Sequence, residues 1–230
     1  MIDLKGKVIV ITGASRGLGR ALARVLAQEG AQLVLANRNV EELNEVAQET
    51  GGIAVVADVS DEAQVQGLAR TTIEKYGRID IWINNAGIWM PHVPIEELNW
   101  KRVHEIFEVN VFGLMYGSKE ALVQMKKQQS GTIINIISVR GVDPLPNEAG
   151  YTASKFAATG FTKCLRLEAE PFGVRVFGIY PGGMKTHLFD EAPRAEYNEF
   201  MDPADVAQKI ISHIKDEHAD PDLILKRPNT

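Results

Sequence analysis

Short runs of apolar, mostly β-branched residues alternate with amphipathic stretches along the whole chain. The apolar runs predict buried strands at residues 7–11, 32–36, 53–57, 79–83, 132–137, 174–179 and 223–225. Apolar residues at helical spacing predict helices at residues 18–28, 40–50, 61–76, 100–128, 150–172 and 203–214. Strands that are apolar on both faces and alternate with helices are typical of a parallel sheet buried between two helical layers.

This alternation indicates the α/β fold class, with a doubly wound, mostly parallel seven-stranded sheet and helices on both faces. No stretch of linker composition interrupts the 230 residues, so residues 1–230 are predicted to form one Rossmann-type, dinucleotide-binding domain. The one irregular stretch, residues 187–202, is predicted to be a substrate loop.

Composition narrows the classes of protein that remain. Apolar residues make up 45% of the chain and charged residues 24%, which excludes a disordered protein. The net charge of −5 argues against a general affinity for nucleic acid or for anionic membranes. The single cysteine, Cys164, cannot form an internal disulfide or a cysteine-based zinc site, and no histidines pair at metal-ligand spacing. Without a signal segment or a long apolar run, a cytoplasmic protein with no metal is expected.

A glycine-rich turn lies between the first predicted strand and the first predicted helix. It reads Thr-Gly-Ala-Ser-Arg-Gly-Leu-Gly over residues 12–19. Glycines there let the chain turn tightly and let backbone N–H groups approach a pyrophosphate, although a strand–helix turn can also need glycine for steric reasons alone. The position favours a dinucleotide site. The residues expected to contact it are Gly13, Ser15, Arg16, Gly17, Leu18 and Gly19.

The end of the second strand bears on the choice of nucleotide. Sites for NAD commonly place an acidic residue there to bind the ribose hydroxyls, but residues 35–38 contain none. Asn37 and Arg38 stand there instead, and Arg38 and Arg16 could flank a 2′-phosphate, for which a planar guanidinium is well suited. We therefore expect NADP(H) as the cofactor. The alternative is that Arg38 is only a solvated loop cation.

Residues whose side chains could take part in catalysis occur mainly in the second half of the chain. Tyr151 and Lys155 are four residues apart and share one helix face, although such a pair can also be a surface contact. Ser138 follows the fifth strand, at the sheet edge where doubly wound folds bind ligands. Residues 84–87, Asn-Asn-Ala-Gly, follow the fourth strand at the same edge, and Asn110 lies in the long helix beyond.

Together these motifs resemble the short-chain dehydrogenase/reductases, and the resemblance covers nearly the whole chain. It rests on the glycine turn, Asp58-Val59, residues 84–87, Asn110, Ser138, Tyr151 with Lys155, and Pro181 to Thr186, all in the order typical of that family. The family is a family of oxidoreductases, so the resemblance implies hydride transfer between a nicotinamide and a carbonyl or secondary alcohol.

The resemblance implies a catalytic role for Asn110, Ser138, Tyr151 and Lys155. Tyr151 would be the acid/base, and the Lys155 ammonium, with the oxidised nicotinamide when present, is expected to favour its phenolate. Lys155 would also hold the nicotinamide ribose, Ser138 would hydrogen-bond the substrate oxygen, and Asn110 would hold a water behind Lys155.

The resemblance also implies further cofactor contacts. Asp58 and Val59 would lie at the adenine, and Asn84 on the ribose side, beside Ala86 and Gly87. The nicotinamide would lie along Pro181, Gly182 and Thr186. Asp58 could equally cap the helix that begins near residue 61.

Residues that follow the strand ends are mostly apolar, which suggests a substrate with a hydrophobic body. They are Trp89, Met90, His92, Val139, Arg140, Val142, Leu145, Met184, His187, Leu188 and Phe189. Residues 190–197 occupy the position of the family's lid. The C-terminus lacks the glycine-rich tail of relatives that reduce acyl-carrier thioesters, which weighs against that activity and against a tetramer built through such a tail.

Several alternatives to a carbonyl reductase stay open. They are a non-catalytic NADP(H) sensor on the same fold, a 3-oxoacyl thioester reductase, and a dehydratase or epimerase. A homodimer or homotetramer is expected, with Cys164 and the exposed face of the helix at residues 150–172 as candidates for the interface.

Overall fold

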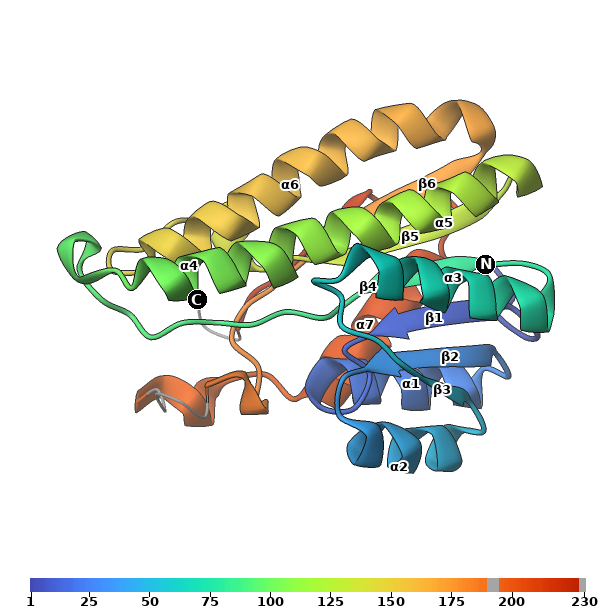
Figure 1. The fold of residues 1–230 in the computed structure, drawn as a ribbon, viewed down its shortest axis with the longest axis horizontal. Helices are drawn as coiled ribbons and strands as arrows, with labels where there is room; N and C mark the ends of the chain where they lie inside the picture. Colours follow the sequence, from blue (N-terminus) through green and yellow to red (C-terminus); the bar gives the residue numbers. More distant parts are fainter. Residues whose placement is uncertain (190–194, 228–230) are drawn as a thin grey trace.

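A single parallel sheet runs through the centre of the molecule. The computed structural model describes residues 1–189 and 195–227. Its strands, in the order in which they pair, are β3 (Ile53–Val56), β2 (Gln32–Asn37), β1 (Val8–Thr12), β4 (Ile81–Asn84), β5 (Gly131–Ile136), β6 (Val174–Pro181) and β7 (Asp222–Leu225) (Figure 1). Every neighbouring pair is parallel. The predicted seven-stranded, doubly wound sheet is confirmed.

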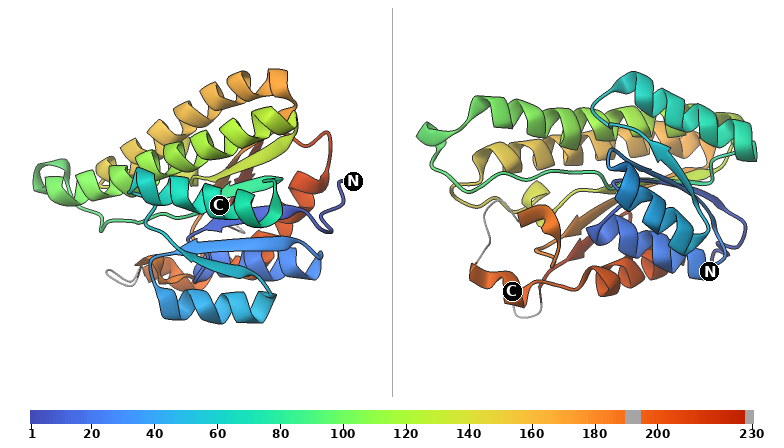
Figure 2. Two further views of the ribbon diagram at one scale, coloured as in Figure 1. Left: turned by 45° about the vertical axis from the view of Figure 1, so that its right-hand side comes forward. Right: turned by 60° about the horizontal axis from the view of Figure 1, so that its bottom comes forward.

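Helices cover both faces of this sheet (Figures 1 and 2). One layer contains α1 (Gly17–Gln28), α2 (Val40–Thr50) and α7 (Pro203–Lys215), whose buried faces pack on one apolar core with residues of β1 and β2. The other contains α3 (Glu62–Tyr76), α5 (Leu114–Gln128) and α6 (Ala149–Ala169), which pack on the second core. The two cores explain why the strands are apolar on both sides.

The predicted helix at residues 100–128 is interrupted in the structure. It is divided into α4 (Trp100–Phe107), a π-helical segment (Glu108–Gly113) and α5. Asn110 lies in the π segment, where its side chain accepts a hydrogen bond from Ile88 N (2.8 Å) and donates one to Ile88 O (2.9 Å). Apolar periodicity could not reveal the extra residue in this turn, and such turns are frequent at functional sites.

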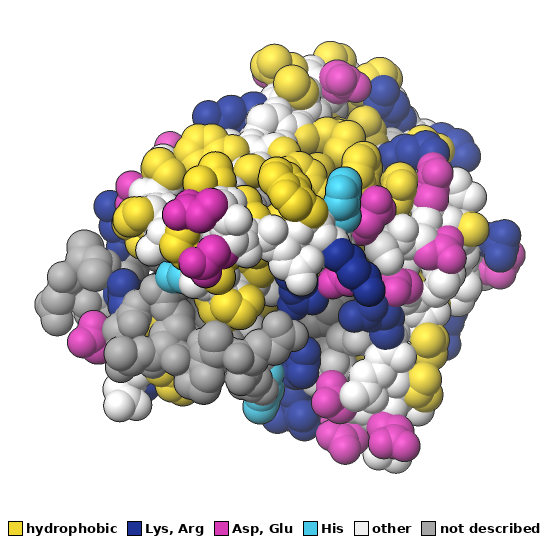
Figure 3. Space-filling view, turned by 60° about the vertical axis from the view of Figure 1, so that its left-hand side comes forward, with side chains coloured by type: hydrophobic (Ala, Val, Ile, Leu, Met, Phe, Trp, Pro, Cys, Tyr) yellow, Lys and Arg dark blue, Asp and Glu magenta, His cyan; other side chains and the backbone are white. Residues whose placement is uncertain are grey.

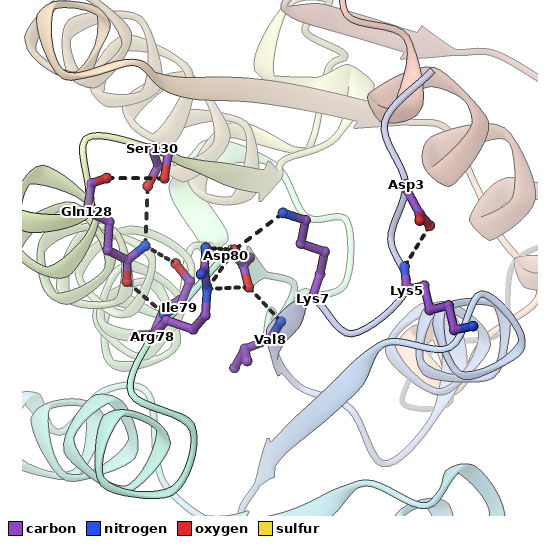
Figure 4. A network of polar contacts seen from close by, with 9 residues as sticks. All are labelled: Asp3, Lys5, Lys7, Val8, Arg78, Ile79, Asp80, Gln128 and Ser130. Atoms are coloured by element: carbon purple, nitrogen blue, oxygen red, sulfur yellow. Dashed lines mark hydrogen bonds and ion pairs between the residues drawn. The ribbon is translucent and has the colours of Figure 1, made fainter.

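A charged cluster fixes the opposite, amino-terminal edge of the sheet (Figure 4). The buried carboxylate of Asp80 accepts a hydrogen bond from Val8 N (2.9 Å) and from the guanidinium of Arg78 (2.6–3.0 Å). Beside it, Gln128 bonds both backbone groups of Ile79. These contacts hold the start of β1 beside β4 and so set the register of the two strands whose other ends bear the candidate site.

The chain order reverses between β1 and β4, because β2 and β3 lie on one side of β1 and the later strands lie on the other. In open α/β sheets such a reversal leaves a crevice at the carboxyl ends of the strands, which is where ligands bind. Within the described residues no helix is both long enough and apolar enough to cross a membrane.

Exposed hydrophobic side chains gather at the end of the molecule where α4 begins (Figure 3). Ile95 is 68% exposed and Trp100 is 66% exposed. The same connecting segment runs back to Trp89, which is 4% exposed and lines the cleft described below.

Candidate active site

A cleft of about 510 Å³ opens at the carboxyl edge of the sheet. One end is formed by the glycine turn after β1, the end of β2 and the segment after β3. The other end is formed by the segments after β4, β5 and β6 and by the first turns of α6. Segments that are far apart in the sequence therefore meet at the switch point of the sheet.

The glycine turn is shaped by close backbone approaches. Gly13 has φ +64° and Gly17 has φ +54°, and a Cβ on Gly13 would lie 2.8 Å from the Cα of Ala86. A Cβ on Gly19 would collide with the carbonyl oxygen of Gly13. The Asn85 side chain clamps the turn by donating to the carbonyl oxygens of Thr12 (2.9 Å) and Gly13 (3.0 Å). Only glycine fits these positions.

This turn leaves the amino terminus of α1 open for an anion. Its N-cap residue, Arg16, makes no side-chain cap hydrogen bond, so the first N–H groups of the helix are not satisfied by the cap. Backbone N–H groups at a helix start, lined by glycines and facing a cleft, fit the pyrophosphate of a dinucleotide. The residues present therefore suit the nicotinamide cofactor that the sequence predicts.

Charged groups of both signs line the end of the cleft at the glycine turn, where the adenosine of a dinucleotide would lie. Arg16 and Arg38 are exposed there, and Nη1 of Arg38 lies 3.2 Å from Oδ2 of Asp58. Although burial alone would raise the pKa of Asp58, hydrogen bonds from Ser60 and the charge of Arg38 hold that pKa below its usual range. The cap of α3 is Asp61, not Asp58. The capping alternative for Asp58 is therefore wrong, and Asp58 lines the cleft.

Ser138, Tyr151 and Lys155 meet at the other end of the cleft. All three line it, and they are 9%, 8% and 5% exposed. Tyr151 and Lys155 lie one turn apart on α6, with Nζ of Lys155 5.5 Å from the centre of the Tyr151 ring. Ser138 begins the short 3₁₀ turn after β5, where its Oγ accepts a hydrogen bond from Arg140 N (3.1 Å). The structure thus brings together the hydroxyl, phenol and amine that the sequence placed on separate elements.

Burial shifts the pKa values of Tyr151 and Lys155. Burial raises the pKa of Tyr151 to about 12, with the nearby Glu148 carboxylate acting in the same direction and Ser138 and Arg140 opposing it. Burial also lowers the pKa of Lys155 to about 8. Lys155 is not among the groups that shift the pKa of Tyr151, so the phenolate-favouring effect expected of Lys155 stays a prediction.

Three of the predicted site residues do not line the cleft. Gly19 lies inside the first turn of α1, and both polar groups of the Asn110 side chain bond the backbone of Ile88. Asn84 is buried beneath the site, where its amide donates to Ser118 Oγ (2.9 Å) and Asn135 Oδ1 (2.8 Å) and accepts from Trp82 Nε1 (2.8 Å). Its neighbour Asn85 lines the cleft instead.

All the other predicted cofactor residues line it. They are Gly13, Ser15, Arg16, Gly17, Leu18, Asn37, Arg38, Asp58, Val59, Ala86, Gly87, Tyr151, Lys155, Pro181, Gly182 and Thr186.

A family model for short chain dehydrogenases matches residues 7–196, which include every residue that lines the cleft except Phe200 and Arg227. The chain belongs to the short-chain dehydrogenase family. A curated relative, levodione reductase of Leifsonia aquatica, is 36% identical over 85% of this chain and 79% of its own.

Solved structures of short-chain dehydrogenases superpose closely on this chain. An alcohol dehydrogenase from Thermococcus sibiricus, complexed with 5-hydroxy-NADP, has a TM-score of 0.88 at 30% identity and covers 98% of this chain and all of its own. A 3-ketoacyl-(acyl-carrier-protein) reductase from Brucella melitensis, complexed with NADH, has a TM-score of 0.90 at 28% identity and covers 97% of each chain.

Of the residues predicted to lie near the substrate of this short-chain dehydrogenase, only some line the cleft. Trp89, Val139, Arg140, Met184, His187 and Leu188 line the cleft, whereas Met90, His92, Val142 and Leu145 do not. The Phe189 side chain and residues 190–194 of the predicted loop lie outside the described residues. Within the part of the chain that the structure describes, no three His, Cys, Asp or Glu side chains are grouped to hold a metal.

The fold brings to the cleft further residues that were not predicted as site residues, among them Glu42, Asn85, Glu148, Phe200 and Arg227. Glu148 is 3% exposed, and its carboxylate pairs with Arg140 Nε (2.8 Å) and His92 Nε2 (2.7 Å). Glu148 could have been found from the sequence, because it is an acidic residue only three positions before Tyr151. Phe200 lies in the predicted substrate loop at residues 187–202, although nothing there distinguished it from its neighbours. Arg227 follows β7 and carried no signal, because only the fold brings the end of the chain to the cleft.

Proposed function

We propose that this chain is an NADPH-dependent carbonyl reductase, which also catalyses the reverse oxidation of a secondary alcohol. The observation that carries the proposal is one cleft with an anion-binding helix terminus at one end and Ser138, Tyr151 and Lys155 at the other. In this proposal a nicotinamide dinucleotide joins the two ends, and it would supply the hydride when bound.

The residues of the chain supply the proton and the geometry. In reduction, the Tyr151 hydroxyl donates its proton to the carbonyl oxygen while the Ser138 hydroxyl hydrogen-bonds the same oxygen. Because the pKa of Tyr151 is raised, the phenol is protonated near neutral pH and holds the proton that reduction of a carbonyl requires. The reverse reaction requires the phenolate and should therefore accelerate as the pH rises. Lys155 would hold the nicotinamide ribose, and Asn110 would hold the Ile88 backbone beside it.

NADPH is the proposed cofactor because Arg16 and Arg38 line the adenosine end of the cleft. Among the relatives, the Thermococcus enzyme is complexed with an NADP derivative and the Brucella enzyme with NADH. The apolar lining beside Tyr151 favours a ketone or aldehyde with a hydrophobic body. We propose that the protein works in the cytoplasm as a homodimer or homotetramer, with an interface on the exposed face of α6, where Leu167 is 71% exposed.

A 3-oxoacyl thioester reductase is the second candidate function, because the Brucella relative with the TM-score of 0.90 is named for that reaction. The two candidates share their chemistry and differ only in the body of the substrate. A 3-oxoacyl thioester added to the substrate panel separates them.

The test is the oxidation of NADPH and NADH with a panel of ketones and aldehydes, for the wild type and Tyr151→Phe. Turnover should fall by about a thousandfold or more in the variant, because the proton donor is lost while cofactor binding is retained. Tyr76→Phe, a partly exposed tyrosine on α3, is the matched control and should keep full activity. Tight NADPH binding without turnover of any carbonyl would favour the non-catalytic sensor.

A further inference from the structure

A carboxylate that the sequence analysis did not single out lies at the adenosine end of the cleft. Glu42 lines the cleft and is half-buried. Its Oε2 accepts a hydrogen bond from Ser15 Oγ (2.9 Å), and Ser15 Oγ in turn accepts one from Asn37 Nδ2 (2.8 Å). Glu42 is therefore tied to the glycine turn and to the end of β2, the two elements that would hold the adenosine ribose.

The local structure of α2 does not require this arrangement. Asn39 is the N-cap and Glu42 stands three residues later, the position from which a glutamate commonly folds back onto the N–H of the cap residue. Here that N–H donates instead to Oδ1 of Asn37 (3.2 Å). The Glu42 side chain leaves its own helix and reaches across to Ser15. A purely helix-stabilising role would leave it near the cap.

The carboxylate changes the charge balance at the point where NADP(H) and NAD(H) differ. Arg16 and Arg38 bring two positive charges to this end of the cleft, and Asp58 is already paired with Arg38. Glu42 adds a second negative charge. Among the described residues, no hydrogen bond donor is paired with its other oxygen, Oε1, so that oxygen can accept a hydrogen bond from a ribose hydroxyl.

The two cofactors would respond to Glu42 in opposite ways. A 2′-phosphate carries roughly two negative charges near neutral pH and is repelled by a nearby carboxylate. A free 2′-hydroxyl can donate to the same carboxylate, which is the role that an acidic residue has in sites for NAD. Arg16 and Arg38 act in the opposite sense, because guanidinium groups attract the phosphate.

We propose that Glu42 is a specificity-determining residue, which limits the preference for NADP(H) set by Arg16 and Arg38 and lets the site accept NAD(H) as well. This inference rests on the proposed function only in that the cleft binds a nicotinamide dinucleotide. It does not depend on the substrate or on catalysis by Tyr151.

The test is direct binding of NADPH and of NADH, each titrated into the substrate-free protein and followed by calorimetry. Glu42→Gln removes the charge and keeps an oxygen that can accept the Ser15 hydrogen bond. We expect the Kd for NADPH to fall by about tenfold and the Kd for NADH to stay the same or rise, as expected for removing one nearby negative charge. The effect on NADPH should shrink at high salt, because it is electrostatic.

Glu41→Gln is the matched control. Glu41 lies in the same first turn of α2, is exposed and does not line the cleft. The Glu41→Gln variant removes the same charge from the same helix terminus. It should leave the ratio of the Kd for NADPH to the Kd for NADH within about twofold of the wild-type ratio.

Two results would overturn the inference: an unchanged ratio of the Kd values in Glu42→Gln, or an equal change in Glu41→Gln. If the wild type and both variants bind neither NADPH nor NADH, the proposed function fails together with the inference. If the ratio shifts as expected and no carbonyl is reduced, the inference stands and only the proposed catalysis fails.

Discussion

Replacing Lys155 by Met should stabilise the folded protein while removing a group of the proposed active site. Lys155 is 5% exposed, and burial lowers its pKa from 10.5 to about 8. At about 1.4 kcal/mol per pKa unit, charged Lys155 costs the folded state up to about 3 kcal/mol at neutral pH. Methionine has a similar length and no charge, so much of that cost should be recovered in the variant.

The pH dependence of this effect has a defined sign. The pKa of Lys155 is lower in the folded than in the unfolded state, so the unfolded state binds more protons between pH 8 and 10.5. Wild-type stability should therefore rise with pH across that window relative to the variant. The advantage of the variant is complete below pH 8 and disappears near pH 10.5. Tyr151 titrates in both proteins and largely cancels in the comparison.

Urea unfolding of the cofactor-free proteins, followed by tryptophan fluorescence, measures the difference. The advantage of Lys155→Met at about pH 7 should fall to about half at about pH 9.5. Lys163→Met, an exposed lysine on the same helix, is the control and should show no such dependence. A variant that is less stable than the wild type at pH 7, or equally stabilised at both pH values, would refute the reasoning.

Two other substitutions test the cleft and the charged cluster beside it. Gly19→Ala places a Cβ against the Gly13 carbonyl and should weaken NADPH binding by about tenfold or more in calorimetric titrations. Gly160→Ala, in open space on α6, is the control. It should bind NADPH as the wild type does and gain about 0.5–1 kcal/mol of stability. Equal NADPH binding by Gly19→Ala and Gly160→Ala would contradict the account of the glycine turn. Glu148→Gln leaves Arg140 and His92 without their buried carboxylate and should lower the free energy of unfolding by about 2 kcal/mol in urea titrations. The exposed Glu168→Gln is its control, and a loss no larger than that of the control would argue against a structural role for the cluster.

The sequence alone determined the layers of the fold and the positions of the principal site residues. Strands such as Val8–Thr12 and Val174–Pro181 lie within one or two residues of their predicted bounds, because burial on both faces demands continuous apolar runs. The glycine turn, Ser138 and Tyr151 with Lys155 were also predictable, but for a different reason. Each is a local pattern placed at a strand end or on one helix face, and the topology brings strand ends to one edge.

Only the tertiary structure decided what those residues meet. The reach of Glu42 to Ser15, the burial of Asn84 under the site and the π turn at Asn110 depend on contacts between segments 22 to 51 residues apart. The pKa values of Tyr151 and Lys155 likewise follow from how completely the surrounding elements exclude water. The periodicity of apolar residues shows which face of a helix or strand is buried. It does not show which other element packs against that face. Side-chain contacts and desolvation are therefore set only when the chain has folded.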